Sequence, residues 1–260
     1  MDSIREKTVV LVTGGGDGLG RAIATAFAAQ KYPVAITGRT QSKLDSVVAE
    51  ISDRGGAAVG FASDVTQREQ VEELNRKIAE RLGPVAILVN NAGIARAAGF
   101  LEMDDSLWET IIRVNVHGTY NCCKVFLPRM IAAKWGRIIN MGSTMSKTAY
   151  SHVSAYATSK HAILGLTRAL AVETATSGVT VNAVCPGYVN TGLTHHNAEL
   201  LAERRGMPLE QALEILARTS PQKRLIEADE VASLILMLAS DAAKGITGQA
   251  ISVDGGAVMV

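Results

Sequence analysis

The chain has 260 residues, of which 47% are hydrophobic and 20% are charged, and this composition is typical of one well-packed soluble domain. Its formal net charge of +1 gives no electrostatic reason to expect binding to nucleic acid or to an anionic membrane. The first ten residues do not resemble a signal peptide and the longest apolar run, at 231–239, is too short to span a bilayer, so we expect a cytoplasmic protein.

Short apolar and β-branched runs alternate with longer helical patterns along the chain. The runs predict seven buried strands, at 8–13, 33–37, 57–63, 85–90, 136–143, 179–185 and 249–254. Segments between them have the spacing of amphipathic helices, for example 19–30 and 68–82. The alternation predicts a single α/β domain over 1–260, a Rossmann-type doubly wound parallel sheet with helices on both faces.

Residues 193–218 interrupt this alternation before the last strand. They contain two helical patterns that are separated at Gly206, Met207 and Pro208. In doubly wound sheets, long connections beyond the carboxyl end of a strand commonly form lids and pockets. We therefore expect this insertion to shape a substrate pocket; the alternative is a plain connecting pair of helices.

Three glycines, Gly14, Gly18 and Gly20, lie where the first predicted strand ends and the first predicted helix begins. Glycine allows the chain to turn tightly and the backbone to approach a ligand closely. The amino terminus of a helix at the same place offers unpaired N–H groups and a favourable dipole to a pyrophosphate. This position favours a dinucleotide-binding loop over an ordinary glycine-containing turn.

The end of the second predicted strand bears on the choice of dinucleotide. In NAD-binding folds of this kind, an acidic residue at this end bonds the adenosine ribose. Here that position is Gly38, and Arg39 follows it with a guanidinium that suits the 2′-phosphate of NADP, unless it is an ordinary surface arginine. Asp17 acts against this choice, because its carboxylate would repel a nearby phosphate. We expect NADP(H), with NAD(H) as the alternative.

A tyrosine and a lysine, Tyr156 and Lys160, are four residues apart in a helical pattern and therefore lie on one helix face. Such a pair is either a core aromatic beside a solvated edge or part of an active site. Four further motifs favour an active site. They are "NNAG" at 90–93, "RVNVHG" around Asn115, "NMGS" ending at Ser143 and "PGYVNTGL" from Pro186.

With the glycine loop and the tyrosine–lysine pair, these motifs resemble the short-chain dehydrogenase/reductase family, from Thr8 to the closing "GQAISVDGG". The resemblance implies an enzyme that interconverts a ketone and a secondary alcohol, with the catalytic set Asn115, Ser143, Tyr156 and Lys160. Ser143 holds the substrate oxygen, and Tyr156 exchanges a proton with it. Lys160 lowers the pKa of the phenol and holds the nicotinamide ribose, and Asn115 anchors a water that extends the proton path.

The resemblance also implies a set of contacts to the cofactor. Asp64 corresponds to the acid that meets the adenine amino group, Val65 packs on the adenine ring, and Thr191 bonds the nicotinamide carboxamide. The full set of expected cofactor-binding residues is Thr13, Gly14, Asp17, Gly18, Leu19, Gly20, Arg39, Thr40, Asp64, Val65, Asn90, Asn91, Ala92, Gly93, Tyr156, Lys160, Pro186, Gly187, Val189 and Thr191.

The residues around Tyr156 bear on the substrate. This stretch is similar to reductases of 3-oxoacyl thioesters and to polyketide ketoreductases, some of which carry the same residues at Lys147 and His152. 3-Hydroxybutyrate dehydrogenases instead carry a lysine and a histidine where this chain has Val153 and Met145. We expect a 3-oxoacyl or polyketide-type ketone. The expected substrate-site residues are Ser143, Met145, Tyr150, Tyr156, Tyr188 and Leu193, with Met141 as a further part of the pocket.

Two other functions stay open. One is dehydrogenation of another secondary alcohol, which would be cyclic, aromatic or similar to 3-hydroxybutyrate. The other is a dinucleotide-binding scaffold without turnover, which would have no need of the serine, tyrosine and lysine that this chain retains.

Partners beyond the cofactor follow from these expectations. A thioester substrate on acyl carrier protein or CoA would bring a phosphate group. Cationic candidates for it are Arg96, Arg129, Lys134, Arg204 and Arg205, although a solvated surface explains them equally well. The family resemblance further implies a homotetramer or homodimer that pairs the helices containing Asn115 and Tyr156.

We expect no metal site, because the cysteines and histidines lack the spacing of metal ligands. Cys122, Cys123 and Cys185 lie among apolar residues, which favours buried reduced thiols. His195 and His196 are adjacent and would point in different directions, so we interpret them as loop or pocket residues.

Overall fold

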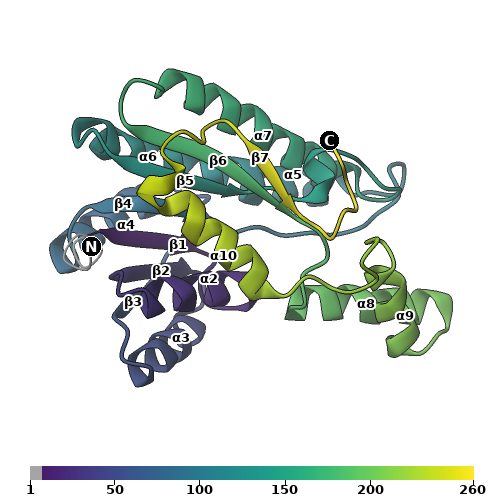
Figure 1. Ribbon diagram of the computed structural model, residues 1–260. Helices are drawn as coiled ribbons and strands as arrows, with labels where there is room; N and C mark the ends of the chain where they lie inside the picture. Colours follow the sequence, from purple (N-terminus) through teal and green to yellow (C-terminus); the bar gives the residue numbers. More distant parts are fainter. Residues whose placement is uncertain (1–7) are drawn as a thin grey trace.

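The computed structural model describes residues 8–260, and the expectation drawn from the first ten residues rests partly on positions outside this range. In the described part, seven parallel strands form one sheet in the order β3-β2-β1-β4-β5-β6-β7 (Figure 1). They are β1 (Val9–Thr13), β2 (Val34–Gly38), β3 (Ala58–Ala62), β4 (Val85–Asn90), β5 (Gly136–Met141), β6 (Val179–Pro186) and β7 (Ala250–Val253). The predicted sheet is therefore confirmed. The main difference is that β5 stops short of Ser143.

Helices cover both faces of the sheet, as predicted (Figure 1). One face carries α2 (Gly18–Ala29), α3 (Gln41–Asp53) and α10 (Ala228–Ala239). The other carries α4 (Arg68–Arg81), α6 (Gly118–Ala132) and α7 (Ser154–Glu173), and α5 (Asp105–Ile112) packs against α7.

The side chains of β1 explain why its first four residues are all apolar. Val10 and Val12 belong to the core beneath α2, α3 and α10, whereas Val9 and Leu11 belong to the core on the other face. Successive side chains of a strand point to opposite faces, so a strand covered on both sides needs a continuous apolar run. Burial of such side chains contributes about 25 cal/mol per Å² of apolar surface removed from water.

The strand order reverses at β1, which pairs with β2 on one side and with β4 on the other. In an open parallel sheet, this reversal leaves a crevice at the carboxyl ends of the strands, where ligands bind. The glycine-containing segment after β1 and the "NNAG" segment after β4 both lie at this edge. The fold thus places the predicted cofactor and catalytic motifs on the same side of the sheet.

The predicted insertion forms two helices, α8 (Gly192–Arg205) and α9 (Leu209–Ala217), which project beyond the sheet (Figure 1). The turn between them uses Gly206 in the left-handed conformation and Pro208 just before α9. Ala198, Ala202, Ala212 and Leu216 form a small apolar core between the two helices. The pair is therefore a hairpin with its own core, which we call the α8–α9 hairpin.

None of the helices in the described range is both long enough and apolar enough to cross a membrane. The three cysteines are free and buried, and burial raises the pKa of the Cys123 thiol to about 12. Within residues 8–260, no group of histidine, cysteine and acidic side chains is arranged to hold a metal ion.

Candidate active site

Asn115 lies in a widened helical turn, Arg113–His117, between α5 and α6. Its side-chain oxygen accepts a hydrogen bond from Ile94 N (2.8 Å), and its amide nitrogen donates to Ile94 O (3.0 Å) and to Ser159 Oγ (3.0 Å). π-type turns of this kind are often found at functional sites. The buried amide thus joins the segment after β4 to α7, and its predicted role in holding a water stays a prediction.

Ser143 lies just after β5 and begins a short 3-10 turn, Thr144–Ser146. Its hydroxyl accepts a hydrogen bond from Met145 N, and its own backbone N–H donates to Ser146 Oγ, each at 3.1 Å. These reciprocal bonds form a capping box, which fixes the orientation of the serine at the edge of the sheet. Ser146 was not identified from the sequence, although a serine three residues after Ser143 is a signal for such a cap.

Tyr156 and Lys160 lie in the first two turns of α7, facing the carboxyl end of β5. The Lys160 ammonium is 5.6 Å from the centroid of the Tyr156 ring. It also donates a hydrogen bond of 2.7 Å to the carbonyl of Met141, the last residue of β5. The lysine is only 7% exposed, so its charge is screened little by solvent and acts strongly on nearby groups. The pair therefore meets on one helix face, as the spacing predicts.

Burial shifts the pKa values of both groups. It lowers the pKa of Lys160 to about 8. It also raises the pKa of Tyr156, although a hydrogen bond with the Ser143 side chain acts in the opposite direction. The neighbouring lysine is expected to lower the pKa of Tyr156. In the protein alone this pKa is nevertheless raised, because burial has the largest effect. The phenol is therefore protonated at neutral pH, which is the form that carbonyl reduction requires.

The glycine loop after β1 can accommodate a dinucleotide. Gly14 adopts a left-handed conformation (φ 65°), which favours glycine. A side chain on Gly20 would lie 2.1 Å from the carbonyl oxygen of Gly14, so only glycine allows this close turn. The first turn of α2, which begins at Gly18, presents N–H groups without partners inside the helix. These residues fit the pyrophosphate of a nicotinamide dinucleotide.

Asp17 and Lys43 form an ion pair of 2.7 Å at the corner where the 2′-phosphate is expected. Asp17 also accepts a hydrogen bond from Gly18 N at the start of α2. The hydrogen bond with Lys43 is the largest effect on the Asp17 pKa and lowers it. The repulsion expected between Asp17 and a phosphate is thus offset by a lysine that sequence reasoning missed. Arg39, which follows β2, is exposed, and Thr40 precedes α3.

The carboxyl ends of β1 and β4 are bonded to each other through the Thr13 hydroxyl, which accepts from Asn91 N and Ala92 N, each at 3.0 Å. Asn91 also donates to the Thr13 carbonyl. Asn90, in contrast, is buried and donates to the Asn140 side chain at 2.9 Å. These contacts show a structural use for each residue, and their expected contacts to the cofactor stay predictions.

The remaining expected cofactor residues lie along the same edge of the sheet. Asp64 accepts from Thr66 N (2.9 Å) in the turn after β3, and Val65 is buried. Thr191 directly precedes α8 and lies beside the glycine loop, because a Cβ on Gly18 would be 3.6 Å from the Thr191 Cβ. Further members of the set also lie near this edge, namely Leu19 in α2, Gly93 after β4, Pro186 at the end of β6, and Gly187 and Val189 beyond it.

The expected substrate residues are not all brought together. Tyr150 and Tyr188 line one cavity of about 10 Å³, large enough for about one water, and neither Met145 nor Leu193 lines it. Met145 is buried, whereas Leu193 is exposed at the start of α8. His195 and His196 lie in the first turns of α8 and not in a loop.

Two of the cationic candidates for a carrier phosphate lie at the wrong edge of the sheet. Arg129 is in the last turn of α6, and Lys134 precedes the amino end of β5. The catalytic motif follows the carboxyl end of β5. The two ends of this six-residue strand are about 20 Å apart, because a strand rises about 3.3 Å per residue. Arg129 and Lys134 are therefore excluded from the mouth of this site. Arg96, Arg204 and Arg205 remain candidates.

Comparisons with known proteins agree with this geometry. The family of short chain dehydrogenases matches residues 8–201. The chain is 38% identical to a D-beta-hydroxybutyrate dehydrogenase of Cupriavidus necator (95% of this chain, 96% of the relative). It is 35% identical to a 3-oxoacyl-acyl-carrier-protein reductase of Thermotoga maritima (98% and 99%). A crystal structure of a variant actinorhodin polyketide ketoreductase with NADPH superposes with a TM-score of 0.94 at 33% identity (97% and 98%). The chain belongs to the short-chain dehydrogenase/reductase family of oxidoreductases.

Proposed function

We propose that this protein reduces a ketone to a secondary alcohol with NADP(H), and that its substrate is a 3-oxoacyl thioester on acyl carrier protein or CoA, or a polyketide-type ketone. The observation that carries the proposal is the meeting of Ser143, Tyr156 and Lys160 at the carboxyl end of β5. These side chains supply an oriented hydroxyl, a protonated phenol and a cation next to the predicted cofactor loop.

Each of the three side chains has a distinct part in the reaction. Ser143 is held by its capping box and can donate a hydrogen bond to the substrate oxygen. Tyr156 donates a proton to that oxygen during reduction and removes it during oxidation. Lys160 stabilises the phenolate that remains after proton donation, because it is a nearby cation. When bound, the nicotinamide supplies the hydride or accepts it.

NADP(H) is supported over NAD(H) by the charges at the end of β2. Gly38 occupies the position at which an acid would bond the ribose, Arg39 follows it, and Lys43 neutralises Asp17. The superposed ketoreductase structure contains NADPH.

Arg39→Ala is expected to raise the KM for NADPH about tenfold or more and to change the KM for NADH by less than about twofold. A charge-assisted hydrogen bond to a phosphate contributes about 1.5–3 kcal/mol, and NADH lacks this phosphate. Initial rates with both cofactors check this. Arg54→Ala removes another exposed arginine, at the far end of α3, and serves as the matched control. Equal effects of Arg39→Ala on the two cofactors would remove the basis for NADP(H).

The similarity to a D-beta-hydroxybutyrate dehydrogenase favours a second candidate, oxidation of a short 3-hydroxy acid. Val153 and Met145 differ from the lysine and histidine that the family resemblance associates with that substrate class. Following NADPH absorbance with 3-oxoacyl-CoA and with free 3-oxobutyrate separates the two. We expect the thioester to have the higher kcat/KM. A preference for the free acid supports the second candidate, and cofactor binding without turnover on any ketone supports a scaffold.

The protein is further proposed to form a homotetramer or homodimer through α6 and α7. Tyr120 on α6 and Val172 on α7 are large apolar side chains that are 47% and 79% exposed in the single chain. Exposed apolar side chains of this size are common at interfaces between subunits. Light scattering measures the mass, and the mass of one chain would contradict this. The cytoplasmic location stays a prediction.

A further inference from the structure

The two ends of the α8–α9 hairpin are joined at its base. Val189 forms a parallel β-bridge with Ile226, Asn190 N donates to Ile226 O (2.8 Å), and Ile226 N donates to Tyr188 O (2.9 Å). The hairpin between these residues is held together by its own apolar core. Its position relative to the sheet is set by the contacts made at this base, together with the bond from Ser220 Oγ after α9 to Gly255 O after β7 (3.2 Å).

The Asn190 side chain adds a second connection at the same place. Its amide nitrogen donates to both carboxylate oxygens of Glu227 (3.3 and 3.4 Å), and its oxygen lies 3.0 Å from His195 Nε2. A carboxylate only accepts, so the amide nitrogen must face Glu227 and the amide oxygen must face His195, whose Nε2 then carries a proton. Asn190 thus bonds the first turn of α8 to the residue that precedes α10.

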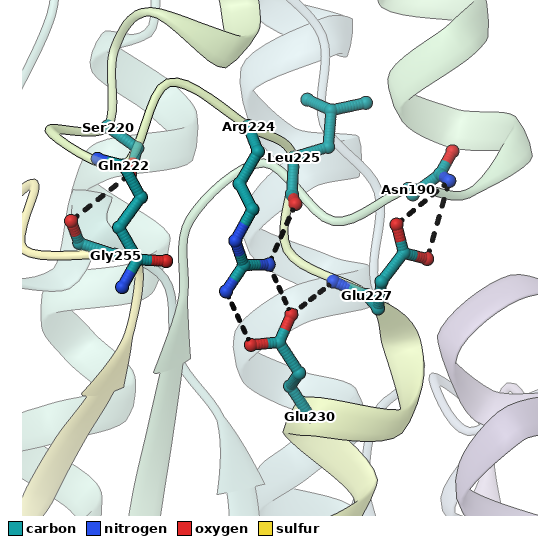
Figure 2. A network of polar contacts seen from close by, with 8 residues as sticks. All are labelled: Asn190, Ser220, Gln222, Arg224, Leu225, Glu227, Glu230 and Gly255. Carbon is teal, nitrogen blue, oxygen red and sulfur yellow. Dashed lines mark hydrogen bonds and ion pairs between the residues drawn. The ribbon is translucent and has the colours of Figure 1, made fainter.

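Glu227 is itself held in place by its neighbours. Its backbone N–H donates to Glu230 Oε1 (2.8 Å), and Glu230 pairs through both oxygens with the Arg224 guanidinium (2.6 and 2.8 Å). The hydrogen bond from Arg224 lowers the pKa of Glu230 to about 2, so this carboxylate stays charged at neutral pH. Figure 2 shows the row of polar contacts from Arg224 to Asn190. Asn190 is therefore bonded to an ordered helix terminus.

Thr191, the expected contact to the nicotinamide carboxamide, is the next residue in the chain. It directly precedes α8 and borders the glycine loop near Gly18. A shift of the Asn190 backbone or of the first turn of α8 would move Thr191 with it. The contacts of Asn190 are exposed to solvent, so each contributes little to stability by itself.

We propose that Asn190 is a positioning residue for the cofactor, which holds Thr191 beside the glycine loop by bonding α8 to the amino terminus of α10. This proposal rests on the proposed function, since it takes Thr191 as a cofactor contact. A primary amide can accept from the imidazole and donate to the carboxylate at once, because its oxygen and its nitrogen have opposite roles. Aspartate keeps the shape and the bond from His195, but it places a second negative charge against Glu227.

The test compares Asn190→Asp with the double variant that combines Asn190→Asp and Glu227→Gln. Asn190→Asp is expected to raise the Kd for NADPH about fivefold, measured by fluorescence titration. In the double variant the glutamine amide can donate to the new carboxylate, and the Kd is expected to return to within about twofold of the natural value. The KM for NADPH should follow the Kd and change more than kcat does, which a general loss of structure would not produce.

Asn190→Ala removes both side-chain contacts without adding a charge, and it serves as a second test should Asn190→Asp unfold. Its Kd is expected to lie between those of the natural chain and Asn190→Asp. An unchanged Kd in both single variants would overturn the proposal, as would a double variant that binds as weakly as Asn190→Asp. Failure of the natural chain to bind NADPH would overturn the proposed function itself, so the two failures are distinguishable.

Discussion

Lys160→Met is expected to lower turnover about a hundredfold or more and to move the pH dependence of alcohol oxidation to higher pH. The Lys160 ammonium is 5.6 Å from the Tyr156 ring centroid and is nearly buried, so it favours the phenolate form of the tyrosine. Without this cation the pKa of the phenol rises, and the base form needed for oxidation appears only at higher pH. Initial oxidation rates measured across a pH series check this shift.

The fold should tolerate this change. Burial holds the pKa of Lys160 at about 8, below its ordinary value of about 10.4 in the unfolded chain. Between these two values the unfolded chain binds more protons than the folded protein, so this group makes the free energy of unfolding rise with pH. Below the lower value, keeping the buried lysine charged destabilises the fold. Methionine removes this penalty, although it also removes the hydrogen bond to Met141.

Two controls separate the role of the charge from other effects. Thermal unfolding at neutral pH is expected to change little in Lys160→Met. Lys160→Arg keeps a cation and should retain more activity than Lys160→Met, with less displacement of the pH profile. An unchanged pH profile in Lys160→Met would show that the lysine does not act on the phenol.

The sheet and the order of the site motifs could be predicted because their signals are local. The continuous apolar run at residues 9–12 reflects burial on both faces, and the glycines after β1 mark the turn into α2. The four-residue spacing of Tyr156 and Lys160 places them on one helix face whatever the rest of the chain does. Parallel strands then bring the carboxyl-end motifs to a single edge of the sheet.

Contacts between distant segments could not be predicted in this way. The ion pair of Asp17 with Lys43 joins residues that are 26 positions apart, and the bond from Asn115 to Ser159 spans 44. No periodicity connects such residues, so the neutralisation of Asp17 was missed. The one sequence signal for this neutralisation was a second cation, Lys43, which lies four residues after Arg39 near the start of the next helix.

The charge of a side chain was also not sufficient to predict whether it lies at the site. Arg129 and Lys134 match the chemistry of phosphate recognition, but they lie at the amino end of β5 and the site lies at its carboxyl end. The net pKa shift of Tyr156 has a similar origin. A neighbouring cation can be expected from spacing, whereas the degree of burial depends on how α7 packs against β5 and β6.

Tyr156→Phe is expected to lower turnover about a thousandfold or more in both directions. Phenylalanine keeps the ring that packs beside Lys160 but lacks the only group proposed to exchange a proton with the substrate oxygen. Proton transfer by a positioned side chain accelerates reactions by about 10²–10⁴-fold, so its loss is among the largest single effects expected here. Binding of the cofactor should be largely kept, because the glycine loop, Thr191 and Lys160 are unchanged.

Turnover of Tyr156→Phe with saturating NADPH and a 3-oxoacyl thioester is therefore the most direct measurement. The measurement requires that the variant unfolds at the same temperature as the natural chain and binds NADPH with the same affinity. Loss of nearly all turnover under these conditions is the result expected if the Tyr156 phenol carries the proton. Turnover equal to that of the natural chain would contradict the proposed mechanism.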